Sequence, residues 1–189
     1  MTDYKLMSAV LLTTSLLIGP ASVVAAAAHG ADAVFARSAR PTADTSSCKA
    51  VFDATSKTLD TPNHSYMDGL GAAGKGEMIT VNGDRYVMVN GKWSKSRMTV
   101  AATKAQEEEN IKTAKVISCK RIGDELVGGD AATVYSEHSE TADTKSDGKV
   151  WISKTRGVLL KNEIQLDSGD ATKQHITIRY EYGNVKAPI

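Results

Sequence analysis

The C-terminal part of the chain contains a stretch in which apolar and polar side chains alternate strictly. In residues 175–183, HITIRYEYG, one face carries Ile176, Ile178, Tyr180 and Tyr182, and the other carries His175, Thr177, Arg179 and Glu181. Such an alternation, with a period of two, predicts a strand with one buried face. The same parity places the following apolar residues of the preceding segment on one face: Val158, Leu160, Ile164 and Leu166. Turn-forming residues at 154–157 and 167–170 separate these segments, so residues 149–188 predict three consecutive antiparallel strands.

Other elements precede this region. An apolar stripe at positions 48, 51, 52, 55 and 59 predicts a helix over residues 46–59. Asn82-Gly83 between two apolar runs predicts a β-hairpin over residues 77–89. Residues 99–112 favour a helix with a thin apolar stripe, whose acidic run at 107–109 reads as a solvated face. Strand character returns at 115–122 and 131–136, so the order of elements predicts an α+β fold with a large antiparallel sheet.

The N-terminus has the layout of an export signal. Residues 6–18 are apolar, follow Lys5 and end at Gly19-Pro20, and alanine-rich cleavage patterns come after them. We expect a signal peptide over residues 1–28, a disordered leader over 29–45 and a single domain over 46–189. The alternative is an uncleaved membrane anchor, although the apolar run is shorter than the roughly 20 residues of a spanning helix. The expected location is periplasmic or secreted, with no transmembrane segment after cleavage.

The composition argues against several function classes. A formal net charge of +1 and an aromatic content of 5% do not favour a nucleic-acid partner. Residues 69–76 approach a phosphate-loop pattern, but Gly76 stands where Ser or Thr is required and a strand, not a helix, is predicted next. We therefore interpret residues 69–76 as a flexible loop before the hairpin. His64, His138 and His175 have no metal-ligand spacing. We therefore expect no cofactor, no metal and no enzymatic activity.

The chain has two cysteines, Cys48 on the first predicted helix and Cys119 in a predicted strand. In an exported protein such a pair predicts a disulfide, here one that ties the helix to the sheet. Two separate buried thiols are the alternative.

Four short motifs resemble a known family. Residues 149–163 (KVWISKTRGVLLKNE) resemble a hairpin of outer-membrane lipoprotein-sorting proteins of the LolA/LolB type, and the ending YEYGNV at 180–185 is similar to the close of the same group. Residues 129–135 and 86–93 fit its middle strands. Leu159-Leu160 stands where a Leu-Pro pair is usual, so the resemblance is that of a divergent periplasmic member.

The resemblance implies the shape of the fold. In that family a large, curved antiparallel β-sheet forms an unclosed half-barrel, helices cover its concave face, and the cavity carries acyl chains or other lipids. No binding residue transfers from the family, only the concave face. Strand parity then suggests these side chains as a hydrophobic ligand-binding lining: Ile152, Leu160, Ile164, Ile176, Ile178, Tyr180 and Tyr182.

The sequence leaves three candidate functions open. The first is non-catalytic periplasmic binding or carriage of a hydrophobic small molecule, a lipid or an acyl chain. The acyl chain can belong to a lipoprotein partner. The second is an envelope protein-interaction module with a closed core and no ligand. The third is a hydrolase assembled from distant strands. The sequence sets no oligomeric state and names no ligand.

Overall fold

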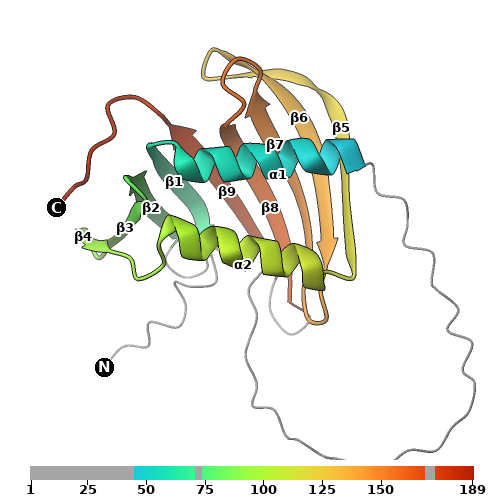
Figure 1. Cartoon of the computed structure of the whole chain (residues 1–189), viewed down its shortest axis with the longest axis horizontal. Helices are drawn as coiled ribbons and strands as arrows, with labels where there is room; N and C mark the ends of the chain where they lie inside the picture. The colour runs from blue at the N-terminus through green and yellow to red at the C-terminus, as the bar shows by residue number, and fades with distance from the viewer. Residues whose placement is uncertain (1–44, 71–73, 169–172) are drawn as a thin grey trace, which may run out of the picture.

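The fold consists of one antiparallel sheet and two helices. A computed structural model describes residues 45–70, 74–168 and 173–189, and these contain nine strands and two helices. The order in the sheet is β4-β3-β2-β1-β9-β8-β7-β6-β5 (Figure 1). The bounds are α1 Thr45–Asp60, β1 Asn63–Leu70, β2 Gly74–Val81, β3 Asp84–Val89, β4 Lys92–Lys95, α2 Val100–Thr113, β5 Val116–Val127, β6 Asp130–Glu140, β7 Lys145–Ser153, β8 Leu159–Asp167 and β9 Gln174–Glu181.

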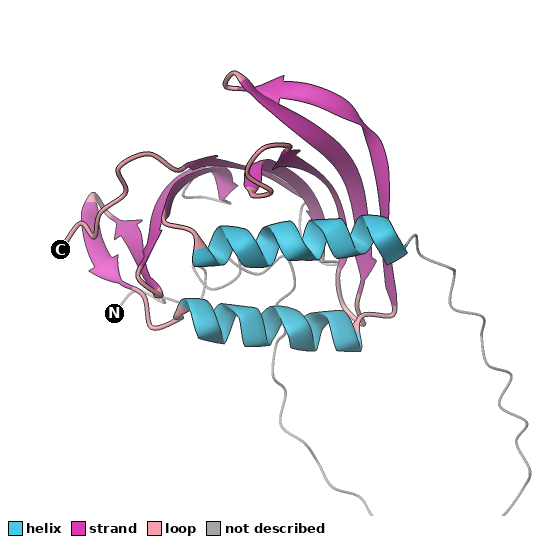
Figure 2. Ribbon diagram, turned by 45° about the horizontal axis from the view of Figure 1, so that its top comes forward, coloured by secondary structure: helices cyan, strands magenta, loops and turns pink. Residues whose placement is uncertain are grey.

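The sheet is curved, and both helices lie in its concavity (Figure 2). β4 and β5 are the two edges of the described sheet, which therefore does not close into a barrel. This confirms the α+β fold class, with a curved, unclosed antiparallel sheet and helices covering its concave face. The predicted signal peptide and almost all of the predicted leader fall in residues 1–44, outside the described residues.

Most of the predicted elements are present. The helices predicted over 46–59 and 99–112 correspond to α1 and α2. The predicted hairpin turn has Asn82 at φ 54° and Gly83 at φ 80°, the left-handed pair that a two-residue hairpin turn requires. Thr99 begins α2 as its N-cap, where its side chain accepts a hydrogen bond from the amide of Ala102.

The sequence prediction was wrong about the segment after α1. It placed a flexible loop at residues 69–76, whereas β1 occupies Asn63–Leu70 and β2 already begins at Gly74. The buried face of β1 consists of Asn63, Ser65 and Met67, two polar side chains and one apolar side chain. Because most of that face is polar, no apolar alternation marks the strand in the sequence.

A register shift between β7 and β8 changes which leucine faces the helices. Trp151 pairs with Lys161, but Ile152 pairs with Leu159. Leu159 packs with α1, in a cluster formed by Cys48, Val51, Ala54, Cys119, Val150, Ile152 and Leu159. Leu160 instead packs with Trp151 and Val134. Trp151 neighbours Val150 along β7, so its side chain points to the other face of the sheet.

The predicted pairing of Cys48 with Cys119 is confirmed. The two Sγ atoms lie 2.04 Å apart and the two Cα atoms 4.9 Å apart. Both residues are buried, at 6% and 4% exposure. The disulfide therefore fixes the start of α1 to β5, an edge strand of the sheet.

Candidate functional site

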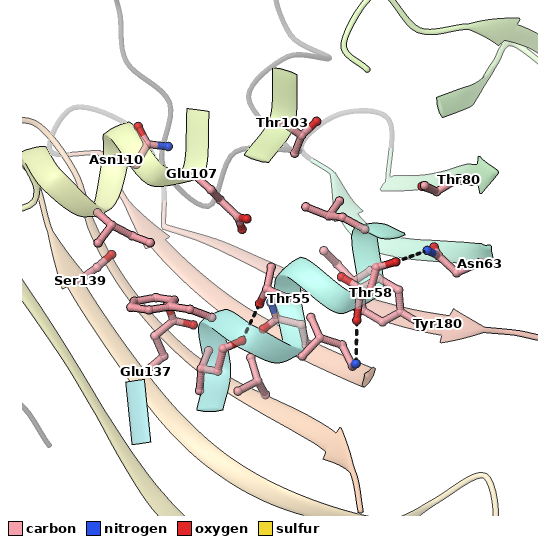
Figure 3. Close-up of a pocket in the computed structure, with 18 of the residues that line it drawn as sticks. Thr55, Thr58, Asn63, Thr80, Thr103, Glu107, Asn110, Glu137, Ser139 and Tyr180 are labelled. Atoms are coloured by element: carbon pink, nitrogen blue, oxygen red, sulfur yellow. Dashed lines mark hydrogen bonds between the residues drawn. The ribbon is translucent and has the colours of Figure 1, made fainter. Parts of the chain in front are cut away.

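A cavity lies between the two helices and the concave face of the sheet (Figure 3). Its volume is about 120 Å³. Every described helix and strand except β4 contributes to its wall. The cavity therefore occupies the middle of the fold and depends on the position of both helices.

Part of the wall is apolar. Its apolar residues are Val51, Phe52, Leu59, Met67, Met78, Ile111, Ala114, Ile117, Val150, Leu159 and Ile178. Met67 on β1 pairs in register with Ile178 on β9, which pairs with Asn162 on β8, which pairs with Val150 on β7. These four lining residues stand in one row across neighbouring strands spaced about 4.8 Å apart, so the row spans roughly 14 Å.

The rest of the wall is polar. Its polar residues are Thr55, Thr58, Asn63, Thr80, Arg85, Thr103, Glu107, Asn110, Glu137, Ser139, Asn162 and Tyr180. Two hydrogen bonds within this wall join α1 to the sheet. Asn63 Nδ2 on β1 donates to the Thr58 carbonyl on α1 at 2.9 Å, and the Leu159 amide on β8 donates to Thr58 Oγ1 at 2.8 Å. Asn162 Oδ1 is buried and has no hydrogen-bond partner among the described residues. A cavity of this mixed character suits an amphiphile better than a pure hydrocarbon.

Arg85 is the buried cation of this wall. It lies on β3 with 1% of its surface exposed. Its Nη1 donates to Thr103 Oγ1 on α2 at 2.5 Å, and its Nη2 lies 2.8 Å from Met78 Sδ. Its Nε has no hydrogen-bond partner among the described residues. Burial lowers the pKa of Arg85 to about 10, so the guanidinium still carries its charge at neutral pH.

Two carboxyl groups share the cavity with this cation. Glu107 extends from α2 into it (Figure 3), and Glu137 enters from β6. Burial raises the pKa of Glu107 to about 7, helped by the nearby Glu137 and opposed by Arg85 and Lys104. Burial also raises the pKa of Glu137. Around neutral pH Glu107 therefore partly holds a proton that an exposed carboxyl would have lost.

Two tyrosines lie near the C-terminal end of β9. Tyr180 lines the cavity, and burial raises the pKa of its hydroxyl. Tyr182 does not belong to the cavity wall; its hydroxyl donates to the carbonyl of Leu159, and burial raises its pKa to about 12. Both hydroxyls therefore stay neutral at physiological pH.

Helix α2 covers the cavity with few buried side chains. Only Val100 and Asn110 of its described residues are buried. Lys104 forms an ion pair with Asp60 at the end of α1, at 2.6 Å, and the amide of Val100 donates to the Gly83 carbonyl at 3.1 Å. Little apolar area thus holds α2 against the sheet, which fits the thin stripe seen in its sequence.

The structure separates the predicted ligand-lining residues. Ile178 and Tyr180 line the cavity. Ile164 and Ile176 pack beside Ile178 in a core cluster with Met67 and Met78. Ile152 packs against α1, whereas Leu160 and Tyr182 pack with Trp151. A ligand-contacting role stays a prediction for all seven residues.

Sequence reasoning missed the charged part of the site. Glu107 belongs to the acidic run that was interpreted as a solvated face; Glu108 and Glu109 are indeed exposed, but Glu107 lines the cavity. A signal was present: Thr103, Glu107, Asn110 and Ala114 follow helical spacing of four, three and four, which places them on one face of α2. Arg85 gave no signal, because a polar residue in a hairpin strand is expected on the solvent side.

Two findings concern metal binding and the crossing of a membrane. Within the described ranges, His, Cys, Asp and Glu side chains do not gather in a group of three that could hold a metal ion. Neither α1 nor α2 has the length and apolarity that crossing a membrane would require.

The comparisons with known proteins concern the fold. No protein-family model and no curated protein matches the chain. Mycobacterium tuberculosis lipoprotein LppX matches with 11% identity over 76% of this chain and 99% of that chain, at a TM-score of 0.45. The complex of Pseudomonas aeruginosa MucA and MucB matches with 13% identity over 76% of this chain and 59% of that chain, at a TM-score of 0.40.

A third solved structure matches at a lower TM-score. A proposed outer membrane lipoprotein-sorting protein domain from Vibrio parahaemolyticus has 8% identity over 68% of this chain and 86% of that chain, at a TM-score of 0.18. At these identities and TM-scores, none of the matches says what this chain binds.

Proposed function

We propose that the protein binds or carries a hydrophobic ligand, without catalysis, in the cavity between its helices and its sheet. The observation that carries this proposal is the cavity itself. Although Thr103 of α2 hydrogen-bonds to Arg85 of β3, about 120 Å³ stays open between the helices and the sheet. The row from Met67 to Val150 offers an acyl chain an apolar wall in which Asn162 is the one polar residue.

The length of the apolar row sets the length of chain that it accommodates. A row of roughly 14 Å is as long as about eleven extended methylenes, each of which adds about 1.25 Å. Burying ten methylenes contributes at most about 8 kcal/mol at about 0.8 kcal/mol each. That is the binding free energy of a micromolar complex, before the cost of immobilising the ligand is subtracted.

The proposed setting is the cell envelope or the exterior. It rests on the export-signal layout of residues 1–28 and on the disulfide, which persists only in an oxidising compartment. N-terminal sequencing of the protein from its own cells tests this. We expect a mature N-terminus between Ala25 and Val34; a membrane-bound species beginning at Met1 would contradict it.

A neutral fluorescent probe tests the binding proposal. We expect N-phenyl-1-naphthylamine to bind the purified protein with micromolar Kd and a blue-shifted emission. Ile111 on α2 lines the cavity and is 37% exposed, so Ile111→Ser removes apolar wall at little cost to the fold. The variant should bind the probe about fivefold more weakly, as expected for about 1 kcal/mol of lost apolar contact.

The matched control makes the same change away from the cavity. Ile122 on β5 is 47% exposed and does not belong to the cavity wall, so Ile122→Ser should leave the probe affinity unchanged. If the wild type does not bind the probe, or if both variants lose affinity equally, the proposal fails.

A protein-interaction role is the second candidate, and edge strand β5 favours it. β5 has one unpaired side, and it carries Leu126 at 76% and Ile122 at 47% exposure. An exposed edge with apolar side chains suits the addition of a strand from a partner. Loss of a partner on Leu126→Lys, with probe binding intact, would support this role beside the first.

A further inference from the structure

Arg85 poses an electrostatic problem that the fold leaves unsolved. Its guanidinium is 99% buried, and no carboxylate of the described residues lies within ion-pair distance of it. A buried charge without a paired counter-charge costs several kcal/mol, because the interior replaces its hydration only in part. Of its donors, Nη1 is used by Thr103 and Nη2 faces a thioether sulfur, a weak acceptor, while Nε has no partner.

The charges around Arg85 do not neutralise it. The carboxyl that acts on it most directly is Glu107 on α2, whose own neighbours are Glu137 on β6 and Lys104 on α2. Tyr180 on β9 is neutral at physiological pH. Because burial raises the pKa of Glu107 to about 7, this carboxyl does not carry a full negative charge at and below neutral pH. Burial raises the pKa of Glu137 as well.

The position of Arg85 relative to the apolar wall defines one end of the cavity. Arg85 lies on β3, next in the sheet to β2 with Met78 and then β1 with Met67. From Met67 the apolar row continues through β9 and β8 to Val150 on β7. The cation thus stands beyond the β1 end of a wall long enough for a medium-chain tail.

We propose that the ligand is an anionic amphiphile whose carboxylate or phosphate headgroup pairs with Arg85 while its chain lies along the apolar row from Met67 to Val150. This rests on the proposed function and names the class of ligand. A planar guanidinium with unsatisfied donors matches the oxygens of either headgroup. The proposal also explains why a charged residue lies at the base of a cavity that burial alone would make apolar.

Four single-chain amphiphiles test the headgroup at constant tail length. Dodecanoate and dodecyl phosphate are the two anions, dodecanol is neutral and dodecylamine is a cation. Each competes with N-phenyl-1-naphthylamine for the purified protein at pH 6, below the aggregation concentration of the amphiphile. We expect both anions to displace the probe at concentrations at least about tenfold lower than the concentration of dodecanol required. A charge-assisted hydrogen bond to Arg85 would tighten binding by about that factor. The stronger of the two anions identifies the headgroup chemistry.

Variants assign the preference to Arg85. Arg85→Gln should reduce the preference for anions over dodecanol to less than about twofold, whereas Arg85→Lys should keep part of it. Arg179 is 61% exposed and paired with Asp68 on the surface, so Arg179→Gln, the same change, should keep the full preference. Circular dichroism verifies the fold of each variant; if Arg85→Gln does not fold, the wild-type ranking decides alone.

The outcomes separate this inference from the function it rests on. If the probe and all four amphiphiles fail to bind, the proposed function itself fails. If the probe binds but dodecanol or dodecylamine competes as well as the anions, only the anionic headgroup is wrong. If the wild type prefers the anions and a folded Arg85→Gln keeps that preference, the assignment to Arg85 is overturned.

Discussion

The affinity of the protein for fatty acids should depend on chain length up to a limit that the cavity sets. The perturbation is the addition of methylenes to the ligand, from octanoate to hexadecanoate in steps of two carbons. The apolar row of roughly 14 Å has room for about eleven extended methylenes. Each methylene buried contributes about 0.8 kcal/mol, a factor of about four in Kd. Two methylenes should therefore tighten binding by roughly fifteenfold while the chain still fits.

Beyond about ten to twelve carbons the gain should fall below about twofold per methylene, because further carbons meet α2 or solvent. Isothermal titration calorimetry measures the series, and a negative heat-capacity change should accompany each productive step. An affinity that ignores chain length would refute burial in the cavity. Steady fourfold gains up to hexadecanoate would refute the limit and mean that α2 yields to a longer chain.

Three further predictions concern the fold around the site. Replacing the Cys48–Cys119 disulfide, which spans 71 residues, by two serines should lower the free energy of unfolding in urea by about 4 kcal/mol, and a loss below about 1 kcal/mol would contradict its role. Gly69→Ala should lower the Tm by several degrees, because the new Cβ would lie 1.8 Å from a backbone oxygen of β9 at φ +90°; Gly183→Ala, which meets no atom within 4 Å, should not. The folded state binds an extra proton at Glu107 between its unfolded pKa near 4.5 and its folded pKa of about 7, so stability should fall as pH rises through that window, and Glu107→Gln should flatten the fall; an unchanged slope would refute it.

The fold could be predicted from the sequence where periodicity reports on packing. The alternation at residues 174–181 appears as β9, and the stripe of residues 46–59 appears as α1. The register shift beside Ile152 could not be predicted, because a bulge changes the face of every residue beyond it without altering composition. It moved Leu159, rather than Leu160, to the side of the helices.

The candidate site was predictable in its location but not in its chemistry. Apolar parity pointed to the concave face, and Ile178 and Tyr180 of the predicted set line the cavity. Arg85 and Glu107 are charged, and single charged residues in a strand and a helix ordinarily face solvent. The packing of α2 against the sheet brings Arg85 of β3 and Glu107 of α2 to one cavity. Sequence periodicity describes one element at a time and carries no information on which elements pack together.

Methionine methyl groups offer the most direct test of the central claim that a ligand chain occupies the cavity. Met67 and Met78 line the cavity, whereas Met88 and Met98 do not, so the four residues provide both the probe and its internal control. The measurement is a carbon–proton correlation spectrum of protein labelled with 13C at the methionine methyls, titrated with dodecanoate. We predict saturable shifts and ligand-chain nuclear Overhauser effects at Met67 and Met78, with Met88 and Met98 unmoved. Shifts confined to Met88 and Met98, or no saturable shift at Met67 and Met78, would contradict the account.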